Sequence, residues 1–305
     1  MRIIAYAYNG GKWNRMSRSL EIGVVFPQTE IGDDPGIIRE YAQEVEALGY
    51  RYILAYDHVL GADPSIRPGW SGPYTSESMF HEPLVLFGYL AGITTSIGLA
   101  TGVIILPQRQ TALVAKQAAE VDVLSGGRLR LGIGIGWNEV EYQALGENFH
   151  NRGARSEEQI AVLRALWSEK VVTFHGRWHT IEAAGLNPLP PRRSIPIWIG
   201  GYAEATLKRV ARIGDGWITF RPPDETTRAA LERLAGYARD AGRDPATIGI
   251  ESQLNLRSVA EERWQTYIDA WRALGAHYLC LNTMGMGLTR IDQHLAVLQR
   301  AAHLR

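Results

Sequence analysis

The chain has 305 residues, of which 46% are hydrophobic and 21% charged, values typical of a globular protein that buries a sizeable core. Lysine plus arginine and aspartate plus glutamate both number 32, so no net basic field favours nucleic acid or an anionic membrane, and a small-molecule partner is expected. Cys280 is the single cysteine, which excludes an intramolecular disulfide framework and favours a reducing compartment. The longest apolar run, 97–106, is far shorter than the roughly 20 residues that span a bilayer, so a cytoplasmic protein is predicted.

The N-terminal segment is basic but lacks the continuous apolar core of a secretory signal. It precedes the first convincing strand and shows no amphipathic pattern. We therefore expect residues 1–18 to be a poorly ordered extension, with Met16 as an alternative start, and residues 19–305 to form a single domain.

Short runs rich in valine and isoleucine alternate with helical patterns along the rest of the chain, as is typical of buried parallel strands. Eight of these runs are predicted to be strands: 21–26, 51–56, 96–106, 129–136, 195–200, 216–220, 247–254 and 277–282. Eight strands, each followed by helical sequence, predict an α/β fold of the (β/α)₈ TIM-barrel type. An open doubly wound sheet is the alternative, because repeated βα units build both folds.

Several helices are marked by their ends or by an apolar face. An Asp-Pro pair and a closing glycine predict a helix over 34–49, and an apolar stripe predicts another over 264–274. Ser156 and Gln159 have the spacing of a capping box, which predicts that a helix begins there and runs to Leu166.

Two segments depart from the simple alternation of strand and helix. Residues 61–80 form a long loop after the second strand, rich in proline, glycine and serine, and residues 170–194 contain two short alternating segments that predict a hairpin insertion before the fifth strand. Long loops at the carboxyl ends of barrel strands usually serve a ligand. Trp70 and Tyr74 of the long loop are therefore candidates for a substrate pocket, although they could equally attach the loop to the barrel.

The predicted fourth strand carries glycine at every second position. Gly132, Gly134 and Gly136 leave one face of this strand without side chains. Because glycine weakens a strand, another group is expected to approach this face closely. A flat ring lying against the glycines is one explanation, and close packing of neighbouring strands and helices is the other.

A helix is predicted to begin immediately after the glycine strand. Asn138 and Glu141 have the spacing of a capping pair, and Trp137 and Tyr142 have the spacing of a hydrophobic staple. These structural roles compete with functional ones for Glu141 and for Trp137, which is a further candidate for the substrate pocket.

One long segment is similar to the luciferase-like monooxygenase superfamily of flavin-dependent and deazaflavin F420-dependent oxidoreductases. This segment is residues 101–167, TGVIILPQRQTALVAKQAAEVDVLSGGRLRLGIGIGWNEVEYQALGENFHNRGARSEEQIAVLRALW, and it most resembles the F420-dependent branch. Two further segments extend the resemblance, YDHVLG at 56–61 and PIWIGGYAEATLKRVARIGDGWI at 196–218. The resemblance covers nearly everything from Ser19 onward, and the fold that it implies is again a (β/α)₈ barrel.

The resemblance implies an oxidoreductase that transfers a hydride between coenzyme F420 and a small organic substrate at the C-terminal mouth of the barrel. In F420-binding relatives an Asp-His pair ends the second strand, and Asp57 and His58 match it here. The histidine lies near the reactive face of the ring, where it could exchange a proton with the substrate. His58 is therefore the expected catalytic residue, whereas without the resemblance a capping or core histidine would be the ordinary interpretation.

The resemblance also implies where the cofactor lies. Relatives have a non-prolyl cis peptide in the third strand, and Gly102-Val103 is the matching position. Gly200 and Gly201 precede a helix whose first amides could bind the cofactor phosphate, although a Gly-Gly pair also suits an ordinary turn. The complete set of predicted cofactor contacts is Gln28, Asp57, His58, Gly102, Val103, Gly134, Gly136, Asn138, Gly200, Gly201 and Thr206.

Two departures from the family narrow this prediction. Some sugar-phosphate dehydrogenases of the family place a catalytic glutamate after the fourth strand, where this chain has Trp137, so that acid role is not expected. Arg67 is the only evident cation of the long loop, which disfavours a sugar phosphate as substrate. His175 and His179 are four residues apart but fall in the predicted hairpin, so no metal site is expected.

The resemblance leaves the cofactor open between F420 and FMN. The nearest alternative function is an FMN-dependent monooxygenase that uses O₂, and a further alternative is a flavin-binding protein without catalysis. Because relatives are commonly dimers, a homodimer is expected.

Overall fold

The computed structural model describes residues 6–9, 12–15, 20–67 and 69–304. Eight parallel strands form a closed barrel, because β10 pairs with β7 in addition to its neighbour β11. The eight strands are β3 (Glu21–Val25), β4 (Tyr52–Ala55), β5 (Gly98–Thr101), β7 (Leu129–Gly134), β10 (Ile197–Gly200), β11 (Gly216–Ile218), β12 (Gly249–Asn255) and β13 (Tyr278–Asn282). All eight predicted strands and the predicted TIM-barrel fold are confirmed, and closure excludes the open doubly wound sheet.

The third predicted strand is divided in two. β5 ends at Thr101, and β6 (Ile104–Ile105) continues the same direction and pairs with β7. The intervening peptide bond, Gly102-Val103, is cis, as predicted. The structure therefore has a bulge at this position of the barrel wall.

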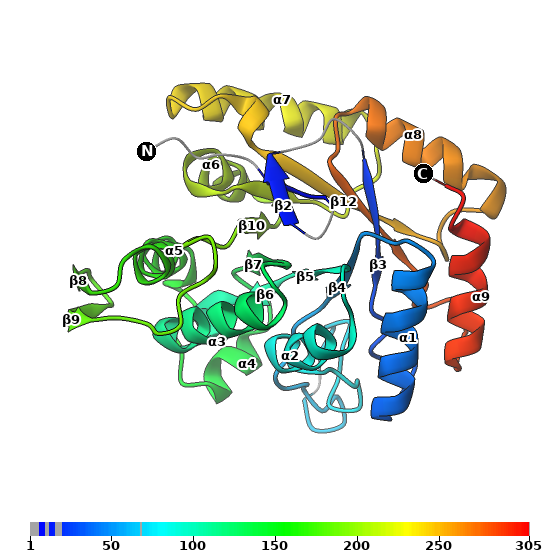
Figure 1. Cartoon of the computed structure of the whole chain (residues 1–305), viewed down its shortest axis with the longest axis horizontal. Helices are drawn as coiled ribbons and strands as arrows, with labels where there is room; N and C mark the ends of the chain where they lie inside the picture. Colours follow the sequence, from blue (N-terminus) through cyan, green and yellow to red (C-terminus); the bar gives the residue numbers. More distant parts are fainter. Residues whose placement is uncertain (1–5, 10–11, 16–19, 68, 305) are drawn as a thin grey trace.

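Helices surround the strands, as Figure 1 shows. They are α1 (Pro35–Ala47), α2 (Pro83–Ile93), α3 (Thr111–Leu124), α4 (Glu139–Ala144), α5 (Arg152–Ser168), α6 (Glu204–Ile213), α7 (Glu225–Asp240), α8 (Trp264–Ala273) and α9 (Ile291–Ala301), with 3₁₀ turns η1 (Leu106–Gln108), η2 (Pro245–Thr247) and η3 (Glu261–Arg263). Asp34 caps α1 as predicted, because its carboxylate accepts from the amides of Gly36 and Ile37. In the part of the chain that the structure describes, no helix has the length and apolar character needed to cross a membrane.

The predicted capping box at Ser156 is wrong. α5 begins one turn earlier, at Arg152, and Ser156 lies inside the helix. Its hydroxyl donates to the carbonyl of Gly153 at 2.8 Å, a bond that satisfies a serine within a helix. Gln159 donates instead to the carbonyl of Leu106 at 3.2 Å, so this residue joins α5 to the turn η1 rather than capping its own helix.

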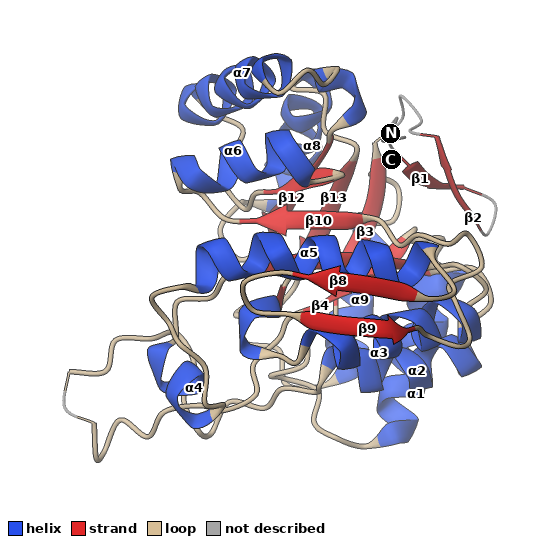
Figure 2. Ribbon diagram, turned by 90° about the vertical axis from the view of Figure 1, so that its left-hand side faces the viewer, coloured by secondary structure: helices blue, strands red, loops and turns tan. Residues whose placement is uncertain are grey.

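Two hairpins lie outside the barrel sheet. β8 (Val172–His175) pairs antiparallel with β9 (Thr180–Ala184), which confirms the predicted insertion before the fifth barrel strand. β1 (Tyr6–Asn9) pairs with β2 (Lys12–Arg15), and Figure 2 shows this hairpin at the end of the barrel opposite α4. Residues 1–5, 10–11 and 16–19 lie outside the described residues, so the poorly ordered extension over 1–18 stays a prediction.

The interior of the barrel contains a buried ion pair. Arg130 of β7 and Glu251 of β12 are almost fully inaccessible and form a bidentate pair, with Nη2 to Oε1 at 2.9 Å. The guanidinium lies 4.3–4.9 Å from the ring centroids of Tyr52, Trp198 and Tyr278. Two opposite charges can be buried at an acceptable cost only when they are fully paired. This ion pair fills the interior of the barrel below its mouth.

Candidate active site at the barrel mouth

His58 follows β4, and its side chain lies between the carboxylate of Glu141 and three aromatic rings. Its Nδ1 lies 3.4 Å from Oε1 of Glu141 in α4, and its side chain is 12% exposed. The imidazole contacts the rings of Tyr74 and Phe80, each at 4.7 Å between centroids, and that of Trp137 at 5.9 Å. The predicted catalytic histidine therefore has a defined orientation.

Glu141 is the residue that orients His58, and sequence reasoning missed this role. Its carboxylate accepts from the amides of Val59 at 2.7 Å and Leu60 at 3.2 Å, and from Nε2 of Gln108 at 3.3 Å. Burial alone would raise the pKa of Glu141, but the interaction with His58 and the two amides outweigh burial and lower it. Glu141 is thus an ionised carboxylate that holds the backbone after His58 as well as the imidazole.

The predicted capping pair is half right. Asn138 begins α4 as expected, because its Oδ1 accepts from the amide of Val140 at 3.1 Å. The predicted return bond from Glu141 is wrong, since the loop after β4 takes up this carboxylate. Asn138 also donates to the carbonyl of Leu60 at 3.5 Å, so both residues attach that loop to α4.

The predicted hydrophobic staple between Trp137 and Tyr142 is wrong. Tyr142 is buried and donates to the carbonyl of Ile135 at 2.7 Å. Trp137 is 46% exposed and lies 5.7 Å from the ring of Trp70, which belongs to the long loop. Trp137 therefore packs against Trp70, which is distant in the sequence, in place of its neighbour Tyr142.

The structure brings the three substrate-pocket candidates into one aromatic cluster around His58. Trp70 donates through Nε1 to the carbonyl of Tyr74 at 3.3 Å, and Tyr74 packs edge-on against Phe80 at 4.7 Å. A side chain at Gly72 would overlap the rings of both Trp70 and Trp137, which explains the glycine between them. The candidates attach the loop to the segment before α4 and also surround the histidine, and their role in substrate binding stays a prediction.

Asp57 is engaged within the protein. Its Oδ1 accepts from Nη2 of Arg109 at 2.7 Å, and its Oδ2 accepts from the amide of Ile105 at 2.9 Å. Arg109 also binds Glu82 at 2.7 Å. Burial raises the pKa of Asp57, and the Arg109 guanidinium opposes that rise. Asp57 therefore joins the end of β4 to the segment after β6, and its predicted contact with cofactor stays untested.

The glycines of β7 and β10 make room for the bulge. A Cβ at Gly134 would lie 2.5 Å from Cγ2 of Val103, and one at Gly200 would lie 2.8 Å from Cγ1 of the same residue. A Cβ at Gly136 would lie 2.7 Å from Cγ2 of Ile105. Gly134 and Gly136 therefore leave room for side chains of the neighbouring strand, and their predicted contact with a cofactor ring stays a prediction.

Gly132 supports the same conclusion. A side chain there would overlap the carbonyl oxygen of Thr101 in the adjacent strand. Of the two explanations for the alternating glycines, close packing is confirmed. A ring at the mouth would meet Val103, which the glycines allow to project into the barrel.

Two features at the mouth fit a cofactor with a polar ring and a phosphate. Gln28 is fully buried, and its Oε1 has no hydrogen-bond partner among the described residues. α6 follows Gly200 and Gly201, its N-cap Ala203 supplies no side-chain hydrogen bond, and Thr206 is buried in the first turn. The first amides of α6 could therefore bind a phosphate.

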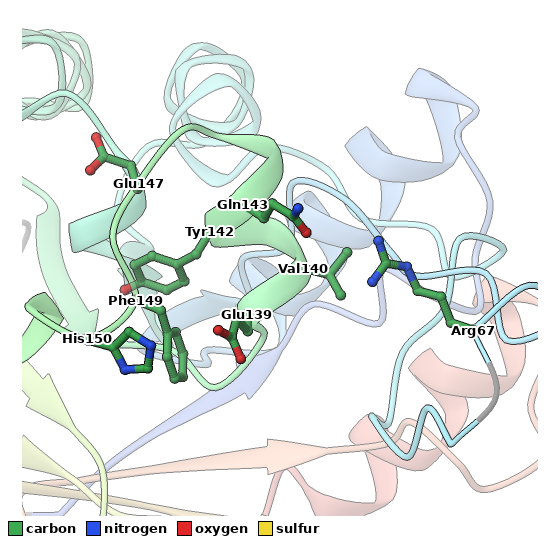
Figure 3. A pocket seen from close by; sticks show the side chains of 8 residues that line it. All are labelled: Arg67, Glu139, Val140, Tyr142, Gln143, Glu147, Phe149 and His150. Atoms are coloured by element: carbon green, nitrogen blue, oxygen red, sulfur yellow. The ribbon is translucent and has the colours of Figure 1, made fainter.

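A cavity of about 460 Å³ lies beside α4. Figure 3 shows Arg67 reaching from the long loop toward the face of α4 that carries Val140 and Gln143. The cavity is also lined by Glu139, Tyr142, Glu147, Phe149 and His150. It includes neither His58 nor any predicted cofactor contact.

The two histidines of the hairpin have separate carboxylate partners. His179 lies 2.8 Å from Glu158 and 2.6 Å from Thr111, and His175 lies 3.4 Å from Glu182. Within residues 6–9, 12–15, 20–67 and 69–304, no group of three or more histidine, cysteine or acidic side chains could hold a metal ion.

The family model for luciferase-like monooxygenases matches residues 20–303. The chain belongs to this family. Its members are F420- or flavin-dependent oxidoreductases and monooxygenases, and the chain is therefore an enzyme of that class. This match confirms the resemblance to luciferase-like monooxygenases that the sequence motifs indicated.

Curated relatives in this family use different cofactors. The FMNH₂-dependent dimethylsulfone monooxygenase of Pseudomonas fluorescens is 31% identical over 79% of this chain and 63% of its own length. The F420-dependent hydroxymycolic acid dehydrogenase of Mycobacterium tuberculosis is 29% identical over 82% of this chain and 66% of its own length. An uncharacterized protein of Mycobacterium tuberculosis is 34% identical over 66% of this chain and 71% of its own length.

Solved structures of the same fold confirm the architecture. An F420-dependent secondary alcohol dehydrogenase in complex with an F420-acetone adduct superposes with a TM-score of 0.75 at 18% identity, covering 92% of this luciferase-like chain and 98% of the other. The monooxygenase RslO1 from Streptomyces bottropensis has the same score and identity over 93% and 98%. At these identities the likeness concerns the fold alone.

Proposed function

We propose that the protein is an F420-dependent oxidoreductase that moves a hydride between the deazaflavin and a small organic substrate at the barrel mouth. The observation that carries this proposal is the pair of His58 and Glu141 beneath the aromatic cluster. A histidine held by an ionised carboxylate is suited to proton transfer, and nearby aromatic rings limit the access of water.

The mouth offers contacts to each part of such a cofactor. Val103 would support the face of the ring, Gln28 would accept from a ring N–H, and the turn at Gly200 and Gly201 would receive the phosphate. When bound, the deazaflavin supplies the hydride acceptor or donor.

Residues of the chain would accept the proton of the substrate and return it in the reverse reaction. Glu141 engages Nδ1 of His58, which leaves Nε2 to take the hydroxyl proton of an alcohol while a hydride leaves the adjacent carbon. The carboxylate of Glu141 lies 3.4 Å from Nδ1 of the imidazolium that results. In the reverse direction His58 returns this proton to the reduced oxygen.

Two relatives support this choice, and one supports the alternative. The names of the F420-dependent hydroxymycolic acid dehydrogenase and of the secondary alcohol dehydrogenase associate this fold with F420 and alcohol substrates. The FMNH₂-dependent relative supports a second candidate function, an FMN-dependent monooxygenase. The two candidates differ in which cofactor the mouth binds.

Cofactor titration tests this difference. Cofactor-free protein is titrated with F420 and, separately, with FMN, while the fluorescence of the ring is followed. We expect tight binding of F420 and weak binding of FMN. A preference for FMN would overturn the proposed cofactor and direct the work to O₂-dependent assays with a flavin reductase.

The role of His58 is tested by substitution. We expect His58→Ala to lower kcat for oxidation of a secondary alcohol by about 10²- to 10⁴-fold, because the proton acceptor is lost, while the Kd for F420 changes much less than kcat. His150→Ala is the matched control, since this exposed histidine lies outside the mouth. Equal kcat values for His58→Ala and the control would refute the proton-transfer role.

A further inference from the structure

The innermost residues at the barrel mouth form two unlike halves. On the consecutive strands from β5 through β11, this layer is apolar or has no side chains; its members are Val103, Gly134, Gly200 and Phe220. On the consecutive strands from β12 through β4, the layer contains Met284 and four neutral hydrogen-bonding side chains, which are Gln28, Tyr56, Gln253 and Asn282. We call the second set the polar half.

Tyr56 is the centre of the polar half. Its side chain extends from the end of β4 across the mouth, where its hydroxyl oxygen accepts from Nε2 of Gln253 and from Nδ2 of Asn282, the latter at 3.3 Å. The orientation of Asn282 is determined, because its Oδ1 accepts from the amide of Met284 at 2.9 Å. Since two amides donate to the hydroxyl oxygen, the proton of Tyr56 is directed to another acceptor.

The hydroxyl of Tyr56 is a neutral donor. Burial raises the pKa of this phenol well above its ordinary value, so it keeps its proton at physiological pH. Its ring packs beside Phe220 at 6.3 Å between centroids, at the boundary between the two halves.

Gln28 supplies the complementary acceptor. Its Nε2 donates to the carbonyl of Tyr56 at 3.1 Å, which determines the orientation of the amide. Its Oε1 then faces a buried position where the described residues offer no donor. A buried acceptor without a partner destabilises the protein, so a ligand N–H is the expected partner.

We propose that Tyr56 and Gln28 recognise the pyrimidine edge of the cofactor ring and so determine which way round the ring binds. The inference rests on the proposed function, but it holds for F420 and FMN alike, because both rings have a pyrimidine end with adjacent C=O and N–H groups. Tyr56 donates to a ring carbonyl, and Oε1 of Gln28 accepts from the ring N–H.

Tyr56→Phe tests the donor. The substitution removes the hydroxyl and keeps the ring, so we expect the Kd of the cofactor that the wild type binds to rise about tenfold, as for the loss of one neutral hydrogen bond. Tyr50→Phe is the matched control, because the Tyr50 hydroxyl donates to the carbonyl of Leu298 at 2.7 Å, away from the mouth. Thermal unfolding of both variants shows whether a change in Kd reflects a general loss of stability.

A ligand with a blocked edge tests the acceptor. FMN methylated at N3 lacks the ring N–H, so we expect the wild type to bind it about tenfold more weakly than FMN. Gln28→Met, which lacks the acceptor, should bind the two ligands almost equally. The comparison is a ratio within each protein and is therefore insensitive to any loss of stability in the variant.

The outcomes separate the two proposals. Tight binding of a cofactor with no effect of Tyr56→Phe, or an equal methylation penalty in the wild type and Gln28→Met, would overturn this inference alone. Failure of the wild type to bind either F420 or FMN would overturn the proposed function and this inference with it.

Discussion

At the scale of the residue, Glu141 shows how one buried carboxylate serves both structure and chemistry. It accepts from two backbone amides of the loop after β4, from Gln108, and it lies beside Nδ1 of His58. Each donor favours the charged form, and together they outweigh the cost of burial. The position of His58, the proposed proton acceptor, therefore depends on the charge of a residue in another element.

Glu141→Gln should destabilise the protein and impair catalysis. We expect a loss of about 1.5–3 kcal/mol in the free energy of unfolding at neutral pH, because hydrogen bonds to a charged group are lost. We also expect a lower kcat with an unchanged Kd for cofactor. Glu139→Gln is the control, since Glu139 is an exposed residue of the same helix.

The pH dependence of this loss has a definite sign. The pKa of Glu141 is lower in the folded protein than in the unfolded chain, so its stabilisation is present above the ordinary glutamate pKa of about 4.3. This stabilisation decreases as the pH falls through the folded value. Urea unfolding of both proteins from pH 7 to pH 3 should therefore give curves that converge in acid, and a constant difference would contradict the assignment.

At the scale of the element, the glycines of β7 and β10 are explained by the neighbouring strand. Gly134 and Gly200 accommodate the two methyl groups of Val103, which follows the cis peptide between β5 and β6. The missing side chains therefore allow the bulge to project toward the mouth. The apolar half of the mouth depends on this packing between strands.

Gly134→Ala should destabilise the barrel by about 1–3 kcal/mol and weaken cofactor binding, because the new Cβ displaces Val103. The added substitution Val103→Ala should recover much of the stability by making room, without restoring cofactor affinity. Gly88→Ala in α2 is the control, since its Cβ position points into open space. Denaturant unfolding and fluorescence titration measure both effects, and equal stability of Gly134→Ala and the control would refute this account.

At the scale of the whole molecule, Arg130 and Glu251 join β7 to β12 through the inside of the barrel. Both charges are inaccessible, and aromatic rings surround the guanidinium. If either residue is removed, the other charge stays buried without a counter-ion, which destabilises the folded protein. The pair therefore makes the barrel sensitive to changes on either side of it.

Arg130→Met or Glu251→Met alone should reduce the free energy of unfolding by about 3–5 kcal/mol, because each leaves an unpaired buried charge. The double variant should lose less than the sum of the two single losses. A double-mutant cycle by denaturant unfolding measures the coupling. Additive losses would show that the two charges do not interact.

Local pattern was sufficient to predict the barrel strands, the hairpin insertion and the cap at Asn138. Alternation of apolar residues and the chemistry of helix ends act over a few neighbouring residues, so the sequence expresses them directly. The same rules misassigned Ser156 and the pair of Trp137 and Tyr142. Their partners come from other elements, and local spacing does not contain that information.

The sequence by itself determined the eight-stranded fold, the family and the location of His58 at the end of the second strand. Only the tertiary structure decided that Glu141 orients this histidine, that Val103 fills the space beside the glycines, and that Tyr56 reaches Gln253 and Asn282. Closure of the barrel is the physical reason. It brings side chains from strands far apart in the chain to one mouth, where their contacts depend on the three-dimensional arrangement of the whole sheet.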